Sequence, residues 1–180
     1  PRGIYLRPNG ARYRHYAQRV RELAHAHLPV VEFASIDEFY GDLTGTERFF
    51  GAEHLAGQLR EAIRQELGLP ISMGLASSKC VAKIATGEAK PDGWRVVPAG
   101  TEAAFLAPLP LSVMPSLGPK TRVRLEGLGL QTLGDLQQLS ADWLAQEFGR
   151  HGIGLWKRAH GRDDSLIRPD RVRKSLGAER

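Results

Sequence analysis

Apolar residues recur with a helical period near the start of the chain. Over residues 10–27 they fall three or four positions apart, a spacing that predicts an amphipathic helix. Asn9 suits the N-cap of this helix, and Pro29 marks its end. We expect the apolar stripe to face the core, and its members are Tyr13, Tyr16, Val20 and Leu23.

The pattern changes in the stretch from Val30 to Thr44. Short runs of β-branched and apolar residues flank turn-forming residues at 35–38, which predicts two strands joined at a tight corner. Two adjacent acids, Asp37 and Glu38, fall at that corner. Neighbouring side chains of one strand point to opposite faces, so these two carboxylates converge only where the backbone bends.

Helical and extended patterns then alternate up to about residue 100. The expected elements are, in order, a helix over 53–67, a strand over 70–76, a helix capped by Ser77-Ser78 and ending near residue 88, and a strand over 94–97. Residues 101–161 contain short helical segments without a convincing strand, and four prolines punctuate the start of that region. We therefore predict an α+β protein, with a mixed sheet covered by helices on one face, a boundary near residues 98–108 and a small all-α domain.

Composition places the chain among soluble globular proteins. Its apolar fraction is 42% and its charged fraction 25%, which are ordinary values. No apolar run approaches the roughly 18 residues that a membrane span needs. The single cysteine, Cys80, excludes an internal disulfide framework and fits a reducing compartment, so we expect a cytoplasmic protein that binds no membrane.

The net charge of +5 is unevenly distributed. Residues 1–27 carry +5, residues 28–119 carry −4, and residues 120–180 carry +4. An acidic middle between two basic ends suits a metal site that lies between surfaces meeting a polyanion. Scattered solvated charges give the same totals.

Two candidate sites lie in the α+β part of the chain. Asp37 and Glu38 offer carboxylate oxygens, which are ligands preferred by hard cations such as Mg²⁺ and Mn²⁺. The alternative for this pair is a solvated acidic turn. Lys90 precedes the rigid Pro91-Asp92-Gly93 turn and is placed to act as a point charge on a phosphate; the alternative is an ordinary solvated lysine.

A third candidate site opens a helix in the all-α region. The segment 115–121 resembles a helix-hairpin-helix element, a sequence-independent binder of DNA backbone. Pro119 suits the first helical turn, and Gly118 permits a backbone too tight for a side chain. Free amides at the helix start would bind a phosphate near Lys120 and Thr121. Ser116 stands where such hairpins usually carry their first glycine, and a plain helix connector is the alternative.

Together these motifs resemble the Y-family translesion DNA polymerases, particularly the DNA polymerase IV branch. The matching pieces occur in family order along nearly the whole chain: Ser35-Ile36-Asp37-Glu38-Phe39-Tyr40 with Asp42, Gly74-Leu75-Ala76-Ser77-Ser78-Lys79, Ala82-Lys83-Ile84-Ala85, Lys90-Pro91-Asp92-Gly93, Leu117-Gly118-Pro119-Lys120-Thr121 and Lys174-Ser175-Leu176-Gly177-Ala178-Glu179.

The resemblance implies a division of the chain into a catalytic palm over residues 1–100, a helical thumb over 101–165 and a basic linker over 166–180. It implies template-directed DNA synthesis past lesions, in which nucleotidyl transfer from a dNTP extends a primer 3′-hydroxyl. It also implies roles for the candidate residues: metal binding and catalysis by Asp37 and Glu38, nucleotide binding by Lys90, and DNA binding by Ser116, Gly118, Lys120 and Thr121.

Further expectations about ligands and partners come from the same resemblance. The family uses two Mg²⁺ ions, with Mn²⁺ as an alternative, and binds primer-template DNA, a dNTP and, through a C-terminal tail, a sliding clamp. We expect a monomer. The family's first metal-binding carboxylate, its fingers and its last domain have no counterpart in the sequence, so we expect a palm and thumb fragment that is inactive alone.

Two other readings compete with a polymerase. A non-catalytic DNA-binding accessory relative would keep the fold, but the retained pair of Asp37 and Glu38 counts against it. A nucleotide cyclase has a similar palm-like sheet, and the helix-hairpin-helix segment counts against that reading.

Overall fold

The computed structural model of the protein describes residues 3–4, 6–46 and 51–169 of the 180. The described chain divides into two compact units: one comprises the residues up to Pro70 together with 167–169, and the other runs from Ile71 to Leu166. No helix in these ranges has the length and apolar character needed to cross a membrane. The segment between the predicted hairpin and the helix expected over 53–67 falls partly outside the described residues, as does the basic linker expected over 166–180.

The first unit begins with helix α1, Gly10–His27, as predicted. The side chain of Asn9 accepts a hydrogen bond from the Arg12 amide at 3.0 Å, which confirms the N-cap. Leu23 is buried as expected, but Tyr13 is 62% exposed. The core role predicted for Tyr13 is therefore wrong: its position on the stripe is helical, but no packing partner buries it.

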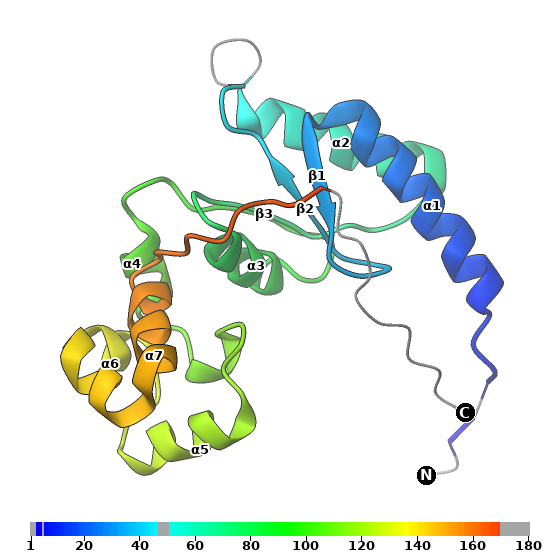
Figure 1. Ribbon diagram of the computed structural model, residues 1–180. Coiled ribbons are helices and arrows are strands. Elements are labelled where there is room, and N and C mark those ends of the chain that lie inside the picture. The colour runs from blue at the N-terminus through cyan, green and yellow to red at the C-terminus, as the bar shows by residue number, and fades with distance from the viewer. Residues whose placement is uncertain (1–2, 5, 47–50, 170–180) are drawn as a thin grey trace. The chain divides into compact units, whose positions relative to one another are not determined.

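A hairpin and a second helix complete this unit. Strands β1 (Val30–Phe33) and β2 (Phe39–Asp42) pair antiparallel, with Phe33 opposite Phe39. Helix α2, Ala52–Leu67, ends where the helix expected over 53–67 should end, and its C-cap Gly68 has the left-handed conformation. Helices α1 and α2 lie side by side (Figure 1), joined on their exposed side by a 3.3 Å ion pair between Arg19 and Glu66.

The second unit begins with a parallel β-α-β element. Strands β3 (Met73–Leu75) and β4 (Trp94–Val96) pair in parallel, and helix α3 (Lys79–Glu88) connects them. Strand β3 lies directly against α3 because Gly74 has no side chain: a Cβ at this position would lie 2.3 Å from the carbonyl oxygen of Ala82. The predicted α+β class is thus confirmed. Where one mixed sheet was expected, the described strands form two small sheets, one antiparallel pair and one parallel pair.

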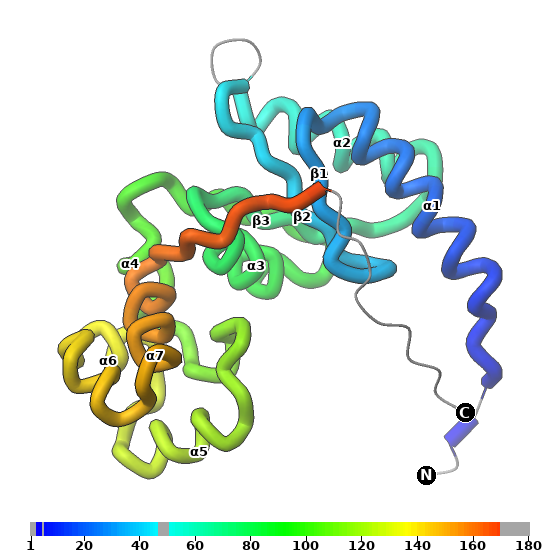
Figure 2. The backbone as a smooth tube through the Cα atoms, in the orientation of Figure 1, coloured from blue at the N-terminus to red at the C-terminus, as the bar shows by residue number. Residues whose placement is uncertain are grey.

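Short helices follow residue 100, as expected, and Figure 2 traces their path. They are α4 (Glu102–Leu106), the 3₁₀ helix η1 (Leu111–Val113), α5 (Pro119–Gly127), α6 (Leu133–Gln137) and α7 (Ala141–Ala159). Helix α7 is kinked at Gly149, whose φ of 61° is left-handed.

One hydrophobic core unites α3 with these later helices. Its fully buried members include Val81 of α3, Leu106 of α4, Leu125 of α5, Leu136 of α6 and Leu155 of α7. Apolar side chains from elements far apart in the sequence thus exclude water together. The boundary near residue 100 between a palm and a thumb comes from the family resemblance, and it stays a prediction.

Candidate functional site

The two carboxylates predicted to bind metal lie on the loop of the β1–β2 hairpin. The loop spans residues 34–38, and the amides of Ala34 and Ser35 both donate to the Glu38 carbonyl, at 2.9 and 3.1 Å. These two bonds fix the bend that the sequence predicted. Asp37 and Glu38 are therefore held on one five-residue loop rather than on a continuous strand.

Local hydrogen bonds orient both carboxylates. The Ser35 hydroxyl donates to Oδ1 of Asp37 at 2.5 Å, and the Tyr40 hydroxyl donates to Oε1 of Glu38 at 2.8 Å. Tyr40 belongs to β2, so this hydrogen bond ties the loop carboxylate of Glu38 to the strand that follows it. Asp37 is exposed and Glu38 half-buried. The loop therefore presents oxygen ligands with defined orientations.

Asp42, at the end of β2, has a local role. Its carboxylate accepts a 2.9 Å hydrogen bond from the Thr44 amide. Hydrogen bonds from the side chain and backbone of Thr44 lower the pKa of Asp42. This carboxylate therefore stabilises the turn after β2.

A buried carboxylate on β1 was not predicted. Glu32 is 7% exposed, and its Oε2 accepts a 2.6 Å hydrogen bond from the Arg168 amide. Alternation along the strand would place Glu32 opposite the buried face occupied by Val31, yet both are buried. The only available signal was a charged residue inside an apolar run.

The Lys90 motif forms a tightly held turn at the end of α3. Asp92 accepts a 3.2 Å hydrogen bond from the Ile71 amide, just before β3. Gly93 is required because a Cβ there would lie 2.1 Å from the carbonyl oxygen of Ala89. The Lys90 amide donates to the Gly87 carbonyl at 3.2 Å, while the lysine side chain is exposed. Asp92 and Gly93 thus build the turn that presents Lys90.

The predicted phosphate-binding hairpin lies between η1 and α5. Pro119 is the first residue of α5, as expected, and Gly118 is its N-cap. A Cβ at Gly118 would meet nothing within 4 Å, and its φ of −66° is open to any residue. The prediction that the backbone at Gly118 is packed too closely for a side chain is therefore wrong. The open space instead leaves the α5 amides accessible, beside exposed Lys120 and half-buried Thr121.

The constraint on the hairpin backbone falls two residues earlier, at Ser116. Its φ is +67°, in the left-handed region that favours glycine. Glycine-rich hairpins of this kind therefore have a physical reason for glycine at this position. The serine adopts the same conformation at an energetic cost.

We predict that Ser116→Gly stabilises the second unit by about 0.5–1 kcal/mol, because glycine removes the left-handed strain. All three tryptophans, Trp94, Trp143 and Trp156, belong to this unit, so urea unfolding followed by tryptophan fluorescence reports on it. Ser112→Gly in η1 is the control and should destabilise, since its backbone is helical. Destabilisation by Ser116→Gly would contradict the assigned conformation.

The other basic residues of α5 contact acids of the protein. Arg124 forms an ion pair with Glu147 of α7 at 2.5 Å and lies 4.8 Å from the centre of the Phe148 ring. Arg122 pairs with Glu126, one turn later in the same helix, at 3.4 Å. These two arginines have structural partners, which makes Lys120 the residue of α5 best suited to contact an external phosphate.

A further capped turn follows α5. Thr132 and Asp135 form a capping box at the start of α6. Amide hydrogen bonds from Gln131 and Thr132 lower the pKa of Asp135. Because that pKa is lowered, the box contributes stability above the ordinary carboxyl pKa and loses it as acidification protonates Asp135.

Two family models match the sequence. One, described as the impB/mucB/samB family, matches residues 1–87. The other, described as the thumb domain of DNA polymerase-iota, matches residues 112–163. The second match contains α5, α6 and α7, together with the candidate phosphate-binding hairpin.

Similar proteins cover nearly the whole chain. DNA polymerase IV of Desulfatibacillum aliphaticivorans is 40% identical over 99% of the chain and 46% of its own length. The Halorhodospira halophila protein of the same name is 40% identical over 100% of the chain and 51% of its own length. The chain thus spans about half the length of these curated relatives.

Solved structures agree with these matches. DinB from Sulfolobus solfataricus superposes with a TM-score of 0.80 at 27% identity, over 92% of this chain and 50% of that one. The insertion ternary complex of Dbh DNA polymerase gives a TM-score of 0.80 at 28% identity, over 91% and 48%. The chain therefore carries a domain of the impB/mucB/samB family, and along nearly its whole length it is similar to DNA polymerase IV and to other Y-family DNA polymerases.

Proposed function

We propose that the protein carries out template-directed DNA synthesis, including synthesis past lesions, by transferring a nucleotide from a dNTP to a primer 3′-hydroxyl. The observation that carries the proposal is 40% identity to DNA polymerase IV along 99% of the chain, with Asp37 and Glu38 on a bent hairpin loop. Residues 1–100 serve as the palm, residues 101–165 as the thumb and residues 166–180 as a linker.

The donor set on the hairpin fits a hard divalent ion in type. Asp37 and Glu38 supply oriented carboxylate oxygens, which suit Mg²⁺, with Mn²⁺ as an alternative. Among the described residues, no cluster of three or more His, Cys, Asp or Glu residues could hold a metal. The pair therefore contributes part of a ligand set that a two-ion site would complete with another carboxylate. Bound metal would polarise the reacting phosphate and lower the pKa of the attacking hydroxyl.

Each candidate residue then has a proposed role in metal binding, triphosphate binding or DNA binding. Asp37 and Glu38 hold the ions, the Ser35 and Tyr40 hydroxyls hold those carboxylates in place, and Lys90 offsets charge on the triphosphate. Free amides at the start of α5, with Lys120 and Thr121, bind DNA backbone without reading base sequence. Ser116 shapes the hairpin that exposes these amides.

The proposed partners follow from these roles. They are primer-template DNA and a dNTP, and the relative solved as an insertion ternary complex is consistent with both. A sliding clamp, a monomeric state and a cytoplasmic location complete the proposal. The expected inactivity of the 180-residue chain on its own stays a prediction.

Primer extension by the purified full-length protein tests the proposal. With a primed template, dNTPs and Mg²⁺, we expect extension that EDTA abolishes and Mg²⁺ restores, because the reaction needs the metal. DNA binding without any extension would favour the alternative, a non-catalytic DNA-binding relative of the same fold.

Lys120→Ala should weaken DNA binding to a similar degree on unrelated duplex sequences. Losing one phosphate contact should also reduce the slope of log K against log salt by about 1. Fluorescence anisotropy between low and physiological salt measures both effects. Lys157→Ala is the matched control, because Lys157 already pairs with Asp164 at 2.9 Å and should change the slope less. A loss confined to one DNA sequence would remove Lys120 from the backbone contact.

A further inference from the structure

The first turn of helix α3 contains no acidic residue to interact with the partial positive charge at the helix start. Ser78 is its N-cap, but Lys79 is its first residue and the first turn holds no acid. The start of a helix carries a partial positive charge and unpaired amides, so a nearby carboxylate is favourable and a lysine is not. A carboxylate from elsewhere in the chain lies at this helix start.

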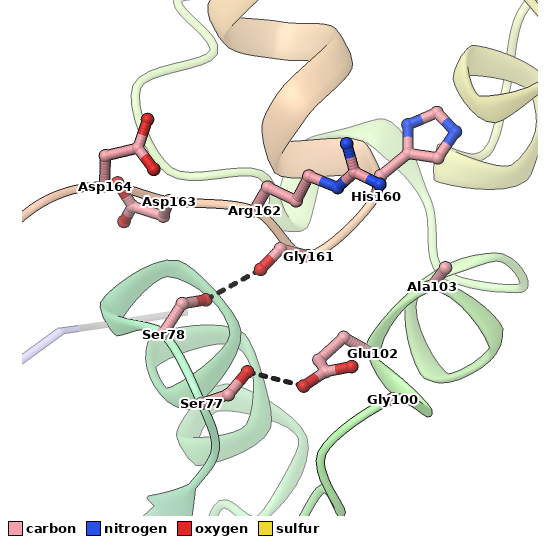
Figure 3. Close-up of a pocket in the computed structure, with 10 residues that line it drawn as sticks. All are labelled: Ser77, Ser78, Gly100, Glu102, Ala103, His160, Gly161, Arg162, Asp163 and Asp164. Atoms are coloured by element: carbon pink, nitrogen blue, oxygen red, sulfur yellow. Dashed lines mark hydrogen bonds between the residues drawn. The ribbon is translucent and has the colours of Figure 1, made fainter. Parts of the chain in front are cut away.

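That carboxylate belongs to Asp163, beyond the end of α7. Its Oδ2 accepts a 3.1 Å hydrogen bond from the Cys80 amide, in the first turn of α3. Beside it, the Ser78 hydroxyl donates to the Gly161 carbonyl at 3.0 Å, as Figure 3 shows. Both bonds join residues 83 positions apart. The segment leaving α7 therefore caps α3 from a distance.

Asp163 is itself held in position. Its Oδ1 accepts hydrogen bonds from the Ser165 hydroxyl at 2.6 Å and from the Ser165 amide at 3.1 Å. Ser77, next to the cap, donates to Glu102 at the start of α4. Ser77, Glu102 and Asp163 line a polar pocket of about 450 Å³ (Figure 3). Each oxygen of Asp163 thus has a defined partner, which is the arrangement of a fixed anchor rather than of a solvated acid.

The opposite end of α3 leads to Lys90. Ala89 closes the helix by donating to the Ala85 carbonyl at 3.0 Å, and the Lys90 amide donates to Gly87. Val81 and Ile84 of α3 lie in the same core as Leu155 of α7. Because a packed helix moves as a unit, a shift at its first turn also displaces the turn that presents Lys90.

We propose that Asp163 is a positioning residue for nucleotide binding: by capping α3 it couples the end of α7 to the helix that presents Lys90. The inference rests on the proposed role of Lys90 toward the triphosphate. Asp163 touches neither substrate nor metal in this proposal, and it acts through α3 alone.

Hydrogen exchange of the full-length protein tests the cap without any polymerase assay. In Asp163→Ala the Cys80 amide should exchange about tenfold faster, because its hydrogen bond is lost. Asp163→Asn keeps a carbonyl acceptor and should restore most of the protection. Asp164→Asn is the control: it removes the same charge one residue later, from a side chain that pairs with Lys157. Unchanged exchange in Asp163→Ala would overturn the proposal.

Steady-state kinetics test the coupling to Lys90. In Asp163→Ala the KM for dNTP should rise about three- to tenfold, as loss of a helix cap suggests, while kcat and DNA affinity stay within about twofold. Asp163→Asn and Asp164→Asn should stay near wild type. A lower kcat with an unchanged KM would indicate a merely structural role and would overturn the proposal.

A double-mutant cycle separates this inference from the proposed function. If Asp163 acts through Lys90, then Asp163→Ala should add little to the KM of Lys90→Ala. Additive effects would overturn the positioning role while leaving Lys90 in the site. A Lys90→Ala variant with wild-type KM would overturn the role of Lys90, and the inference with it.

Discussion

Asp37→Ala in the full-length protein should abolish primer extension while leaving DNA affinity within a few-fold of wild type. The substitution removes a carboxylate that the hairpin loop and the Ser35 hydroxyl hold in place. Loss of a metal ligand removes charge stabilisation from the transition state, an effect of about a hundredfold or more. The backbone contacts proposed for α5 do not depend on this residue. Gel-based primer extension and anisotropy on the same preparation measure the two quantities.

The matched control is another exposed acid of the same unit. Glu61 of α2 accepts a hydrogen bond from Gln65 in the next turn, and Glu61→Ala should leave extension unchanged. Extension above a few per cent of wild type in Asp37→Ala would remove this residue from the site.

Gly74→Ala should destabilise the second unit by about 2–4 kcal/mol, since overpacking of a tight contact forces the backbone to move. The added Cβ would lie 2.3 Å from the Ala82 carbonyl oxygen and 2.6 Å from the Thr86 amide nitrogen. Both atoms belong to the backbone of α3, so no side-chain rotation relieves the clash. Strand β3 and helix α3 must therefore separate. Tryptophan fluorescence during urea unfolding measures the loss.

Gly87→Ala provides the opposite sign within the same helix. A Cβ at Gly87 meets nothing within 4 Å, and the residue is exposed near the end of α3. Alanine should therefore stabilise the unit by about 0.5–1 kcal/mol, because it lowers the entropy of the unfolded chain. Equal effects of the two substitutions would contradict the packing of β3 on α3.

Features that depend on residues close in sequence could be predicted from the sequence alone. The hairpin follows from two short runs of β-branched and apolar residues around a turn, and Asp37 and Glu38 lie within that turn in the sequence. The caps at Asn9 and Ser78 could be predicted from single residues, and each is confirmed by a hydrogen bond that the side chain accepts from the amide three positions later. The motif order along the chain also identified the family.

Features that depend on distant partners were decided by the tertiary structure. Tyr13 has the helical spacing of a core residue but is exposed, because burial depends on what packs beside it. Strand pairing depends on which backbone groups meet, and periodicity does not encode it. The carboxylate that balances α3 comes from 83 residues later. Glycine is required at position 74 because a Cβ there would lie within 3 Å of the α3 backbone, and only the folded chain determines that distance.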